Sequence, residues 1–220
     1  MVYPDKIIRS NRRTIAVCID RFGRVIVRAP KRVEESRIFA FLEEKQAWIE
    51  RKQSERASAG IVLPSENLDG YSFLLLGKTC RIQTREESNI AFDNENGVLY
   101  LPKDKTRERL VKWLKENAKR IFTQVTTQKA TQMGVSFQSV RISSAKTRWG
   151  TCSADNKISY TFRLIYAPKE MIEYVIVHEL SHVRYKNHSS AFWGEVEKYI
   201  PDWKNRRKWL KTHGALMEIF

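Results

Sequence analysis

The segment spanning residues 171–180 constrains the fold most strongly, because as a helix it is apolar on every side and yet contains ionisable residues. Its apolar members are Met171, Ile172, Tyr174, Val175, Ile176, Val177 and Leu180. A helix that is hydrophobic all round is buried rather than amphipathic. His178 and Glu179 belong to the same helix, and a buried polar group without a partner costs roughly 1–3 kcal/mol. We therefore expect a central helix whose polar side chains share a partner.

The spacing of these polar residues predicts a metal site. His178, Glu179 and His182 form an H-E-x-x-H pattern. On an α-helix, positions four residues apart differ by about 40° around the axis and one turn of rise, so both imidazoles can bind one ion. Glu179 projects about 60° from His182, which is too far round for an obvious ligand but suits a base that holds a metal-bound water. The pattern predicts zinc, with Glu179 as the general base of a hydrolysis.

A third ligand is needed, and His188 follows His182 after a short interval. The polar stretch from Lys186 to Ser190 permits the chain to turn back toward the helix. Glu195 and Glu197 are the alternatives, either as a replacement ligand or as hydrogen-bond acceptors for a ligand histidine. The competing interpretation is a core helix whose histidines hydrogen-bond to neighbouring groups, with His188 in an ordinary loop.

Charge makes nucleic acid a candidate partner. The 220 residues include 40 Lys and Arg against 25 Asp and Glu, which gives a net charge of +15 spread along the chain. Such a surface attracts polyanions, although a solvated basic surface explains it equally well. The best candidate for a phosphate-binding face lies on the helical segment 103–133 and consists of Arg107, Arg109, Lys112, Lys115, Lys119 and Arg120.

Cysteine use and hydropathy indicate a reducing compartment. Cys18, Cys80 and Cys152 are widely spaced and no C-x-x-C occurs, so a disulfide framework is not expected. Residues 1–13 contain no apolar run of signal-peptide length, and no later segment approaches about 18 uninterrupted apolar residues. We expect a cytoplasmic location and no membrane partner. The sequence carries no signal for the oligomeric state.

The order of the predicted elements favours an α+β fold. The N-terminal part is β-rich: a hairpin over 14–29 that turns at 21–23, a helix over 33–56, a connection over 54–69 and short strands within 71–101. These strands and the hairpin would form one small, mostly antiparallel sheet. A helix over 103–133 follows, then strands at 135–143 and 157–163 and helices starting near residues 168, 189 and 203. We place the boundary between two parts at 102/103, giving 1–102 and 103–220.

Several residues near the histidines are candidates for other roles. Arg148 is suited to steady a substrate carboxylate or an oxyanion, or to anchor its turn. Tyr185 and Tyr199 are further candidate oxyanion donors. The strand 157–163 is the candidate for main-chain pairing with an extended peptide. Cys152 raises an alternative chemistry, a thiol nucleophile assisted by a histidine, although a small buried cysteine is far commoner.

The motifs together resemble a known family. The chain has H-E-L-S-H, His188 and Ala191-Phe192-Trp193, preceded by Arg148-Trp149-Gly150-Thr151-Cys152. With the early R-S-x-R-x-T segment at 9–14 and the helix containing Trp48 and Ile49, it resembles the YgjP-like zinc metallopeptidases nearly end to end. That family is similar in its motif to the WLM and SprT-like proteases. The resemblance implies a minimal zincin-like α+β domain over 103–220.

Carried over to these positions, the resemblance implies His178, His182 and His188 as ligands of one zinc per chain and Glu179 as the base. The expected activity is hydrolysis of peptide bonds in a protein or peptide substrate, with nucleic-acid-associated proteins as one possible class. The alternative is a non-enzymatic, basic nucleic-acid-binding module with a structural zinc site. The spacing of the three histidines equals that of metzincins, but Tyr185 stands where those have glycine. Because tyrosine does not cheaply adopt the left-handed turn that glycine makes, the path to His188 must differ.

Overall fold

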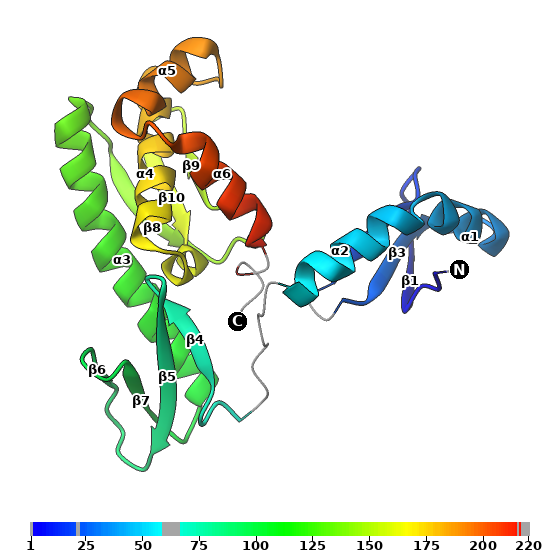
Figure 1. The fold of residues 1–220 in the computed structure, drawn as a ribbon, viewed down its shortest axis with the longest axis horizontal. Coiled ribbons are helices and arrows are strands. Elements are labelled where there is room, and N and C mark those ends of the chain that lie inside the picture. The colour runs from blue at the N-terminus through cyan, green and yellow to red at the C-terminus, as the bar shows by residue number, and fades with distance from the viewer. Residues whose placement is uncertain (1, 21–22, 59–66, 215, 217–220) are drawn as a thin grey trace. The chain divides into compact units, whose positions relative to one another are not determined.

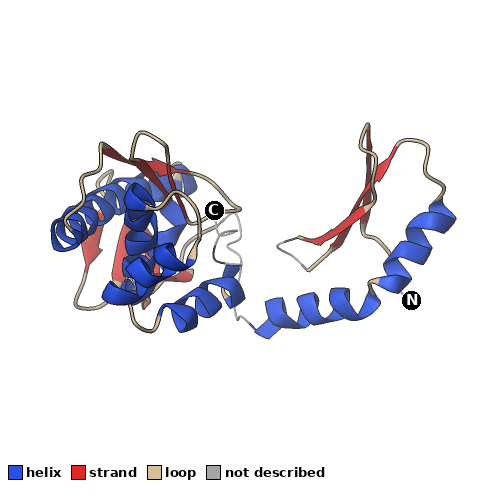
Figure 2. Cartoon of the chain, turned by 90° about the horizontal axis from the view of Figure 1, so that it is seen from above, coloured by secondary structure: helices blue, strands red, loops and turns tan. Residues whose placement is uncertain are grey.

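The computed structural model describes residues 2–20, 23–58, 67–214 and 216. By its contacts the chain divides into two compact units, Met1–Leu63 and Pro64–Phe220, and each is described by itself. Both units combine helices with a small sheet, so the predicted α+β class is confirmed (Figures 1 and 2). Residues 21–22 of the predicted hairpin turn and 59–66 of the predicted connection lie outside the described residues.

The first unit is built on a three-stranded sheet. Its strands are β1 (Lys6–Ser10), β2 (Ala16–Ile19) and β3 (Val25–Pro30), in the order β1-β3-β2. β2 and β3 pair antiparallel, as the hairpin prediction requires, whereas β1 pairs parallel to β3 and was not predicted.

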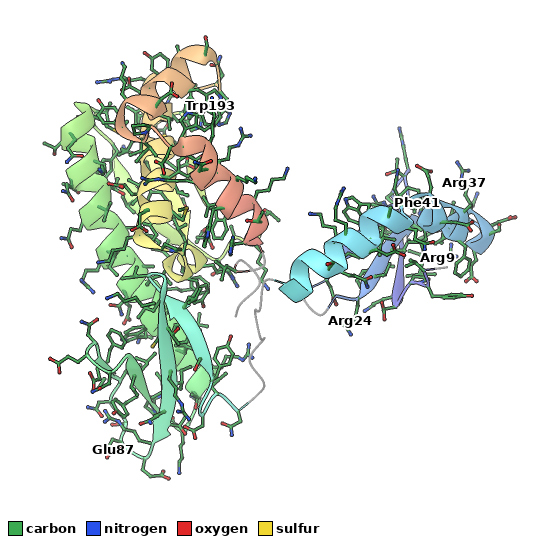
Figure 3. The ribbon with its side chains drawn as sticks, viewed as in Figure 1. Arg9, Arg24, Arg37, Phe41, Glu87 and Trp193 are labelled. Carbon is green, nitrogen blue, oxygen red and sulfur yellow. The ribbon has the colours of Figure 1, made fainter. Side chains whose placement is uncertain are left out.

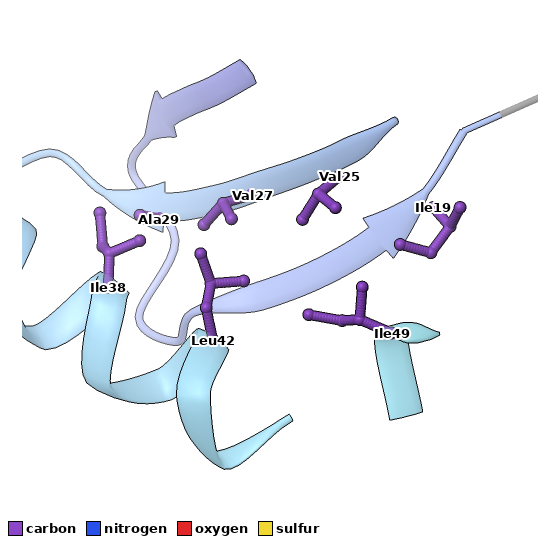
Figure 4. Packing of buried hydrophobic residues seen from close by; sticks show 7 residues of the cluster. All are labelled: Ile19, Val25, Val27, Ala29, Ile38, Leu42 and Ile49. Atoms are coloured by element: carbon purple, nitrogen blue, oxygen red, sulfur yellow. The ribbon is translucent and has the colours of Figure 1, made fainter. Parts of the chain in front are cut away.

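Two consecutive helices pack against this sheet. They are α1 (Glu35–Glu44) and α2 (Gln46–Ser58), and the chain turns between them at Lys45. The predicted helix over 33–56 is therefore divided in two. The buried core consists of Ile19, Val25, Val27, Ala29, Ile38, Leu42 and Ile49, which point at one another from both layers (Figure 4). The unit thus has a core of its own.

The second unit begins with a separate four-stranded sheet. Its strands are β4 (Ser72–Leu75), β5 (Lys78–Arg85), β6 (Ala91–Asp93) and β7 (Val98–Pro102), in the order β4-β5-β7-β6. The strands occur where the sequence predicts them, but they do not extend the N-terminal hairpin into one sheet. β5 and β7 pair parallel, which the connection through β6 makes possible.

A long helix, α3 (Thr106–Met133), follows β7 and ends where Gly134 takes the left-handed conformation at φ 62°. Glycine pays no Cβ penalty there, so the predicted helix end is confirmed. Leu110, Leu114 and Phe122 of its inner face are fully buried. α3 packs on β7 and also on the later helix α4. The boundary expected at 102/103 therefore falls inside the second unit.

The next three strands are β8 (Ser139–Ser143), β9 (Gly150–Cys152) and β10 (Lys157–Thr161), in the order β8-β10-β9. β10 pairs with β8 on one side and with β9 on the other. The prediction that strand 157–163 pairs with a substrate is therefore wrong, because both its edges are already used. β9, which the sequence did not predict, is an edge strand in the part of the chain that the structure describes.

The central helix, α4 (Lys169–Arg184), follows the short 3-10 segment η1 (Phe162–Tyr166). The β4–β5 turn packs on its start: a Cβ at Gly77 would lie 2.9 Å from Pro168 Cα. At its end, the Arg184 guanidinium donates hydrogen bonds to the carbonyls of Met133 and Gly134. α5 (Ser190–Tyr199) and α6 (Trp203–Thr212) complete the unit. None of the described helices is long and apolar enough to cross a membrane.

Candidate metal centre

The structure brings the three predicted histidines together. His178 and His182 project from the same face of α4, and His188 reaches back from the loop that follows it. The Nε2 atoms of His178 and His188 lie 3.1 Å apart, and one ring nitrogen from each of the three lies within 4.8 Å of the others. Among the described residues, no fourth His, Cys, Asp or Glu joins this cluster. The described part of the site therefore has three protein groups that can bind a metal.

The path to His188 runs through an extended residue. Tyr185 ends α4 with φ −123° and ψ 102°, so it avoids the left-handed conformation. Its carbonyl lies 2.9 Å from His182 Nδ1 and accepts a hydrogen bond from that nitrogen. The bond leaves His182 Nε2 as the unprotonated nitrogen, which is the form that binds a metal. The different route that tyrosine requires therefore also orients a histidine.

An aromatic cluster holds the imidazoles in place. Phe192 of α5 is fully buried, and its ring centroid lies 4.4–4.9 Å from those of His178, His182 and His188. Trp193, labelled in Figure 3, stacks on His188 and on Trp203. Ser189 starts α5 by accepting a hydrogen bond from the Phe192 amide. The sequence Ala191-Phe192-Trp193 thus positions the ligand rings.

The protonation states suit a cation. Burial, together with the neighbouring His182, His188 and Arg207, lowers the pKa of His178 to about 3, so its ring is neutral. Burial also lowers the pKa of His182. Ligand nitrogens about 2.0–2.1 Å from a tetrahedral zinc lie roughly 3.3 Å apart, close to the His178–His188 separation. The three side chains therefore fit a divalent metal.

Glu179 lies beside the histidines but outside the cluster. Its side chain is buried, and burial raises the pKa of its carboxyl to about 8. The carboxyl lies against the backbone of Gly150 in β9: a Cβ there would be 2.6 Å from Glu179 Oε1. Only glycine leaves this space free. The backbone of β9 at Gly150 thus packs closely against the Glu179 side chain of α4.

A pocket opens next to Glu179, with a volume of about 360 Å³. Its described lining comes from β9 and the residue before it, from α4 and from α6. These residues are Trp149, Gly150, Tyr174, Val175, His178, Glu179, Arg207, Leu210 and Lys211. The volume is at the lower end of the range of about 300–1,000 Å³ typical of ligand pockets.

The other predicted candidates lie elsewhere. Glu195 is 2% exposed and forms ion pairs with Arg184 and Lys198, so it does not join the histidines. Glu197 is exposed on the same helix. Arg148, Tyr185 and Tyr199 do not belong to the described lining of the pocket. The structure therefore does not support any of these three residues as a donor to the oxyanion.

Cys152 is not poised as a nucleophile. Burial raises the pKa of its thiol, and the nearby Lys186 only partly offsets this. A nucleophilic cysteine needs a lowered pKa, because the thiolate is the reactive form. The thiol alternative therefore has no support in this geometry.

At least three of the six cations of the predicted basic face on α3 make contacts within the protein. Arg109 pairs with Asp104, and Lys119 donates to the Val140 carbonyl. Lys115 lies 5.6 Å from the centre of the Phe162 ring. These contacts reduce the number of side chains that are free for phosphate groups. Binding of nucleic acid stays a prediction.

Sequence reasoning missed Gly150, Tyr174 and Arg207 as parts of the site. Trp149 and Gly150 belong to the motif Arg148–Cys152 that carries the family resemblance, but the sequence assigned them no role. The pairing of β9 that places Gly150 beside Glu179 is not visible in a three-residue strand. Tyr174 lies one turn before His178, a spacing that does place it on the same face of α4. Arg207 comes from a helix whose packing on α4 the sequence does not reveal.

Comparison with known proteins agrees with this geometry. The family model for YgjP-like proteins, metallopeptidase domain, matches residues 13–213. A search of curated proteins finds no match.

Two solved structures of metallopeptidase zymogens show partial similarity. Abylysin of Pyrococcus abyssi is 26% identical, with 41% of this chain and 92% of that chain covered and a TM-score of 0.39. Jannalysin of Methanocaldococcus jannaschii is 19% identical, with coverage of 41% and 91% and a TM-score of 0.37. The assignment rests on the family match, which spans most of both units: the chain belongs to the YgjP-like metallopeptidase family.

Proposed function

We propose that the protein hydrolyses peptide bonds with one zinc ion held by His178, His182 and His188, and with Glu179 as the general base. The observation that carries this proposal is the convergence of three imidazoles, with one ring nitrogen of each within 4.8 Å of the others, beside a buried carboxyl that is not a member of the cluster. A structural zinc site would need a fourth protein ligand. The cluster among the described residues has three, which favours a catalytic site over the non-enzymatic alternative.

The protein side chains divide the chemistry between them. When bound, a zinc ion polarises the scissile carbonyl and lowers the pKa of a coordinated water toward about 7. Glu179 takes a proton from the attacking water and returns it to the leaving nitrogen. Burial favours the neutral form of the carboxyl, which suits the state after it has taken the proton. A bound cation nearby would favour the ionised form that must accept the proton. Phe192 and Tyr185 keep the imidazoles oriented throughout.

We propose β9 as the strand that aligns the substrate. Gly150, Thr151 and Cys152 pair with β10 along one edge, and the described residues place no strand on the other. An extended peptide added to a sheet edge is bound through its main chain, largely independent of its sequence. Gly150 adjoins Glu179, so a peptide on this edge would bring its backbone close to the base.

Substitution of Glu179 by Gln tests the role of the base. The amide keeps the shape of the side chain but cannot accept the proton, so we expect kcat to fall by about 10²–10⁴-fold. Metal content should stay at the wild-type level. Glu197→Gln is the matched control, because it removes a carboxylate from an exposed position. Glu179→Gln protein that hydrolyses peptides at the wild-type rate would refute the assignment.

A further inference from the structure

Two cations line the pocket beside Glu179 without an acidic partner. Arg207 and Lys211 are exposed, lie one turn apart on α6 and both border the pocket. No ion pair joins either one to a carboxylate among the described residues. Like charges at this spacing repel each other and weaken a helix. Lys211 lies in the last turn, where a cation is favourable to the helix dipole, but that does not explain why Arg207 and Lys211 both border the pocket.

The neighbouring arginine shows the contrast. Arg206 pairs with Asp202 at 2.9 Å and with Glu173 at 3.3 Å, so its charge is balanced within the protein. Arg207 instead lies over the ring of Trp193, 5.1 Å from its centre. A guanidinium stacked on an aromatic face is held in place while its N–H groups stay available. Arg207 is thus positioned but not neutralised.

The rest of the described lining is mainly apolar. Trp149, Val175 and Leu210 form walls, and the Tyr174 ring packs edge-on against His178. The one acidic member, Glu179, has its carboxyl seated against Gly150 of β9. Arg207 borders the same pocket as His178 and Tyr174. A ligand in this pocket would contact apolar side chains and, on the α6 side, the positive charges of Arg207 and Lys211.

We propose that this pocket binds a carboxylate of the substrate, carried on a residue next to the scissile bond and recognised by Arg207 and Lys211. The inference rests on the proposed peptidase function, because peptides supply carboxylates either from an Asp or Glu side chain or from their C-terminus. Arg207 offers a fork of N–H donors that matches a carboxylate, and Lys211 adds a second charge one turn away. The apolar walls contact the aliphatic part of the same residue.

A role for Arg207 as an oxyanion donor would look different. An oxyanion donor acts in the transition state and so lowers kcat for every substrate alike. A carboxylate subsite changes the binding of charged peptides and leaves neutral ones unaffected. Binding measured without turnover separates the two roles.

The test is equilibrium binding of three fluorescently labelled peptides, measured by fluorescence anisotropy on the Glu179→Gln protein, in which we expect turnover to be strongly slowed. One has a central Glu and an amidated C-terminus, one a central Gln and a free C-terminus, and one a central Gln and an amidated C-terminus. We expect one of the two carboxylate peptides to bind about tenfold or more tightly than the neutral peptide, as charge-assisted hydrogen bonds predict. Which of the two binds identifies the source of the carboxylate.

Variants of α6 complete the test. Added to the same background, Arg207→Gln should reduce binding of the carboxylate peptide to the level of the neutral one, and Lys211→Gln should weaken it. Lys208→Gln removes the same charge from an exposed position of α6 outside the described pocket lining, and should leave the preference intact. Equal losses in Arg207→Gln and Lys208→Gln would refute the subsite, because the preference would then reflect only the net charge of the protein. Equal binding of all three peptides would also refute it, because the protein would then show no preference for a carboxylate.

Hydrolysis by the wild type separates this proposal from the proposed function. A carboxylate preference that depends on Arg207, in a protein that cleaves none of the three peptides, supports the subsite and counts against the peptidase assignment. Cleavage of all three peptides at equal rates, with equal affinities, supports the peptidase assignment and overturns the subsite.

Discussion

At the scale of single residues, the proposed hydrolysis depends on the positions of the catalytic side chains relative to their neighbours as well as on their identities. Glu179 has space because residue 150 is glycine, and His182 has its metal-binding tautomer because it donates to the Tyr185 carbonyl. The H-E-x-x-H pattern predicts which residues meet on α4, since that follows from helical periodicity. It does not predict Gly150, whose contact with Glu179 depends on the pairing of β9.

Replacement of Gly150 by Ala tests this fit. The added methyl group would lie 2.6 Å from Glu179 Oε1 and would force the carboxyl to move. We expect the protein to fold and to retain its metal, with kcat/KM reduced by at least about tenfold, since small displacements of catalytic groups are costly.

Gly194→Ala is the matched control for this substitution. Gly194 lies inside α5 and a Cβ there meets nothing within 4 Å. Alanine at such a position raises stability by roughly 0.5–1 kcal/mol. Unchanged activity in Gly150→Ala, measured beside this control, would mean that Glu179 does not need its present position.

At the scale of elements, α4 is held at both ends, and α5 is tied to it by a buried carboxylate. Glu195 accepts from Arg184 of α4 and from Lys198 of its own helix. Arg184 also binds the last carbonyls of α3. The helices were predictable from the sequence because the helical spacing of their apolar residues extends over several turns and because residues typical of helix ends flank these segments. β1 and β9 were not predicted, because neither Lys6–Ser10 nor Gly150–Cys152 shows the alternation of apolar and polar residues that indicates a strand.

Glu195→Gln separates a structural role of this carboxylate from the ligand role that the sequence left open. Loss of one partner of a buried ion pair is expensive, but Arg184 and Lys198 are 40% and 67% exposed, so solvent screens the effect. We expect the free energy of unfolding to fall by about 1–3 kcal/mol in urea denaturation. Metal content should equal that of the wild type. A clear loss of metal at unchanged stability would make Glu195 a ligand.

At the scale of the whole molecule, two units with separate cores belong to one family match, which extends over residues 13–213. The sequence predicted the α+β class, yet it joined the hairpin and the later strands into one sheet. Tertiary contacts, among them those of Gly77 with Pro168 and of β7 with α3, assign the four-stranded sheet to the second unit. A sequence pattern indicates which face of a helix or strand is apolar. It does not indicate which other helix or strand packs against that face.

The central claim is that three histidines hold one metal ion, and its most direct test is metal content after dialysis against a mild chelator. Wild-type protein is compared with His188→Ala and with His213→Ala, in which the removed histidine stacks on Trp209 away from the cluster. We expect about one zinc per chain in the wild type and in His213→Ala, in keeping with a three-ligand catalytic site, and clearly less in His188→Ala. Equal zinc in His188→Ala and the wild type, or no metal in any of the three proteins, would contradict the account.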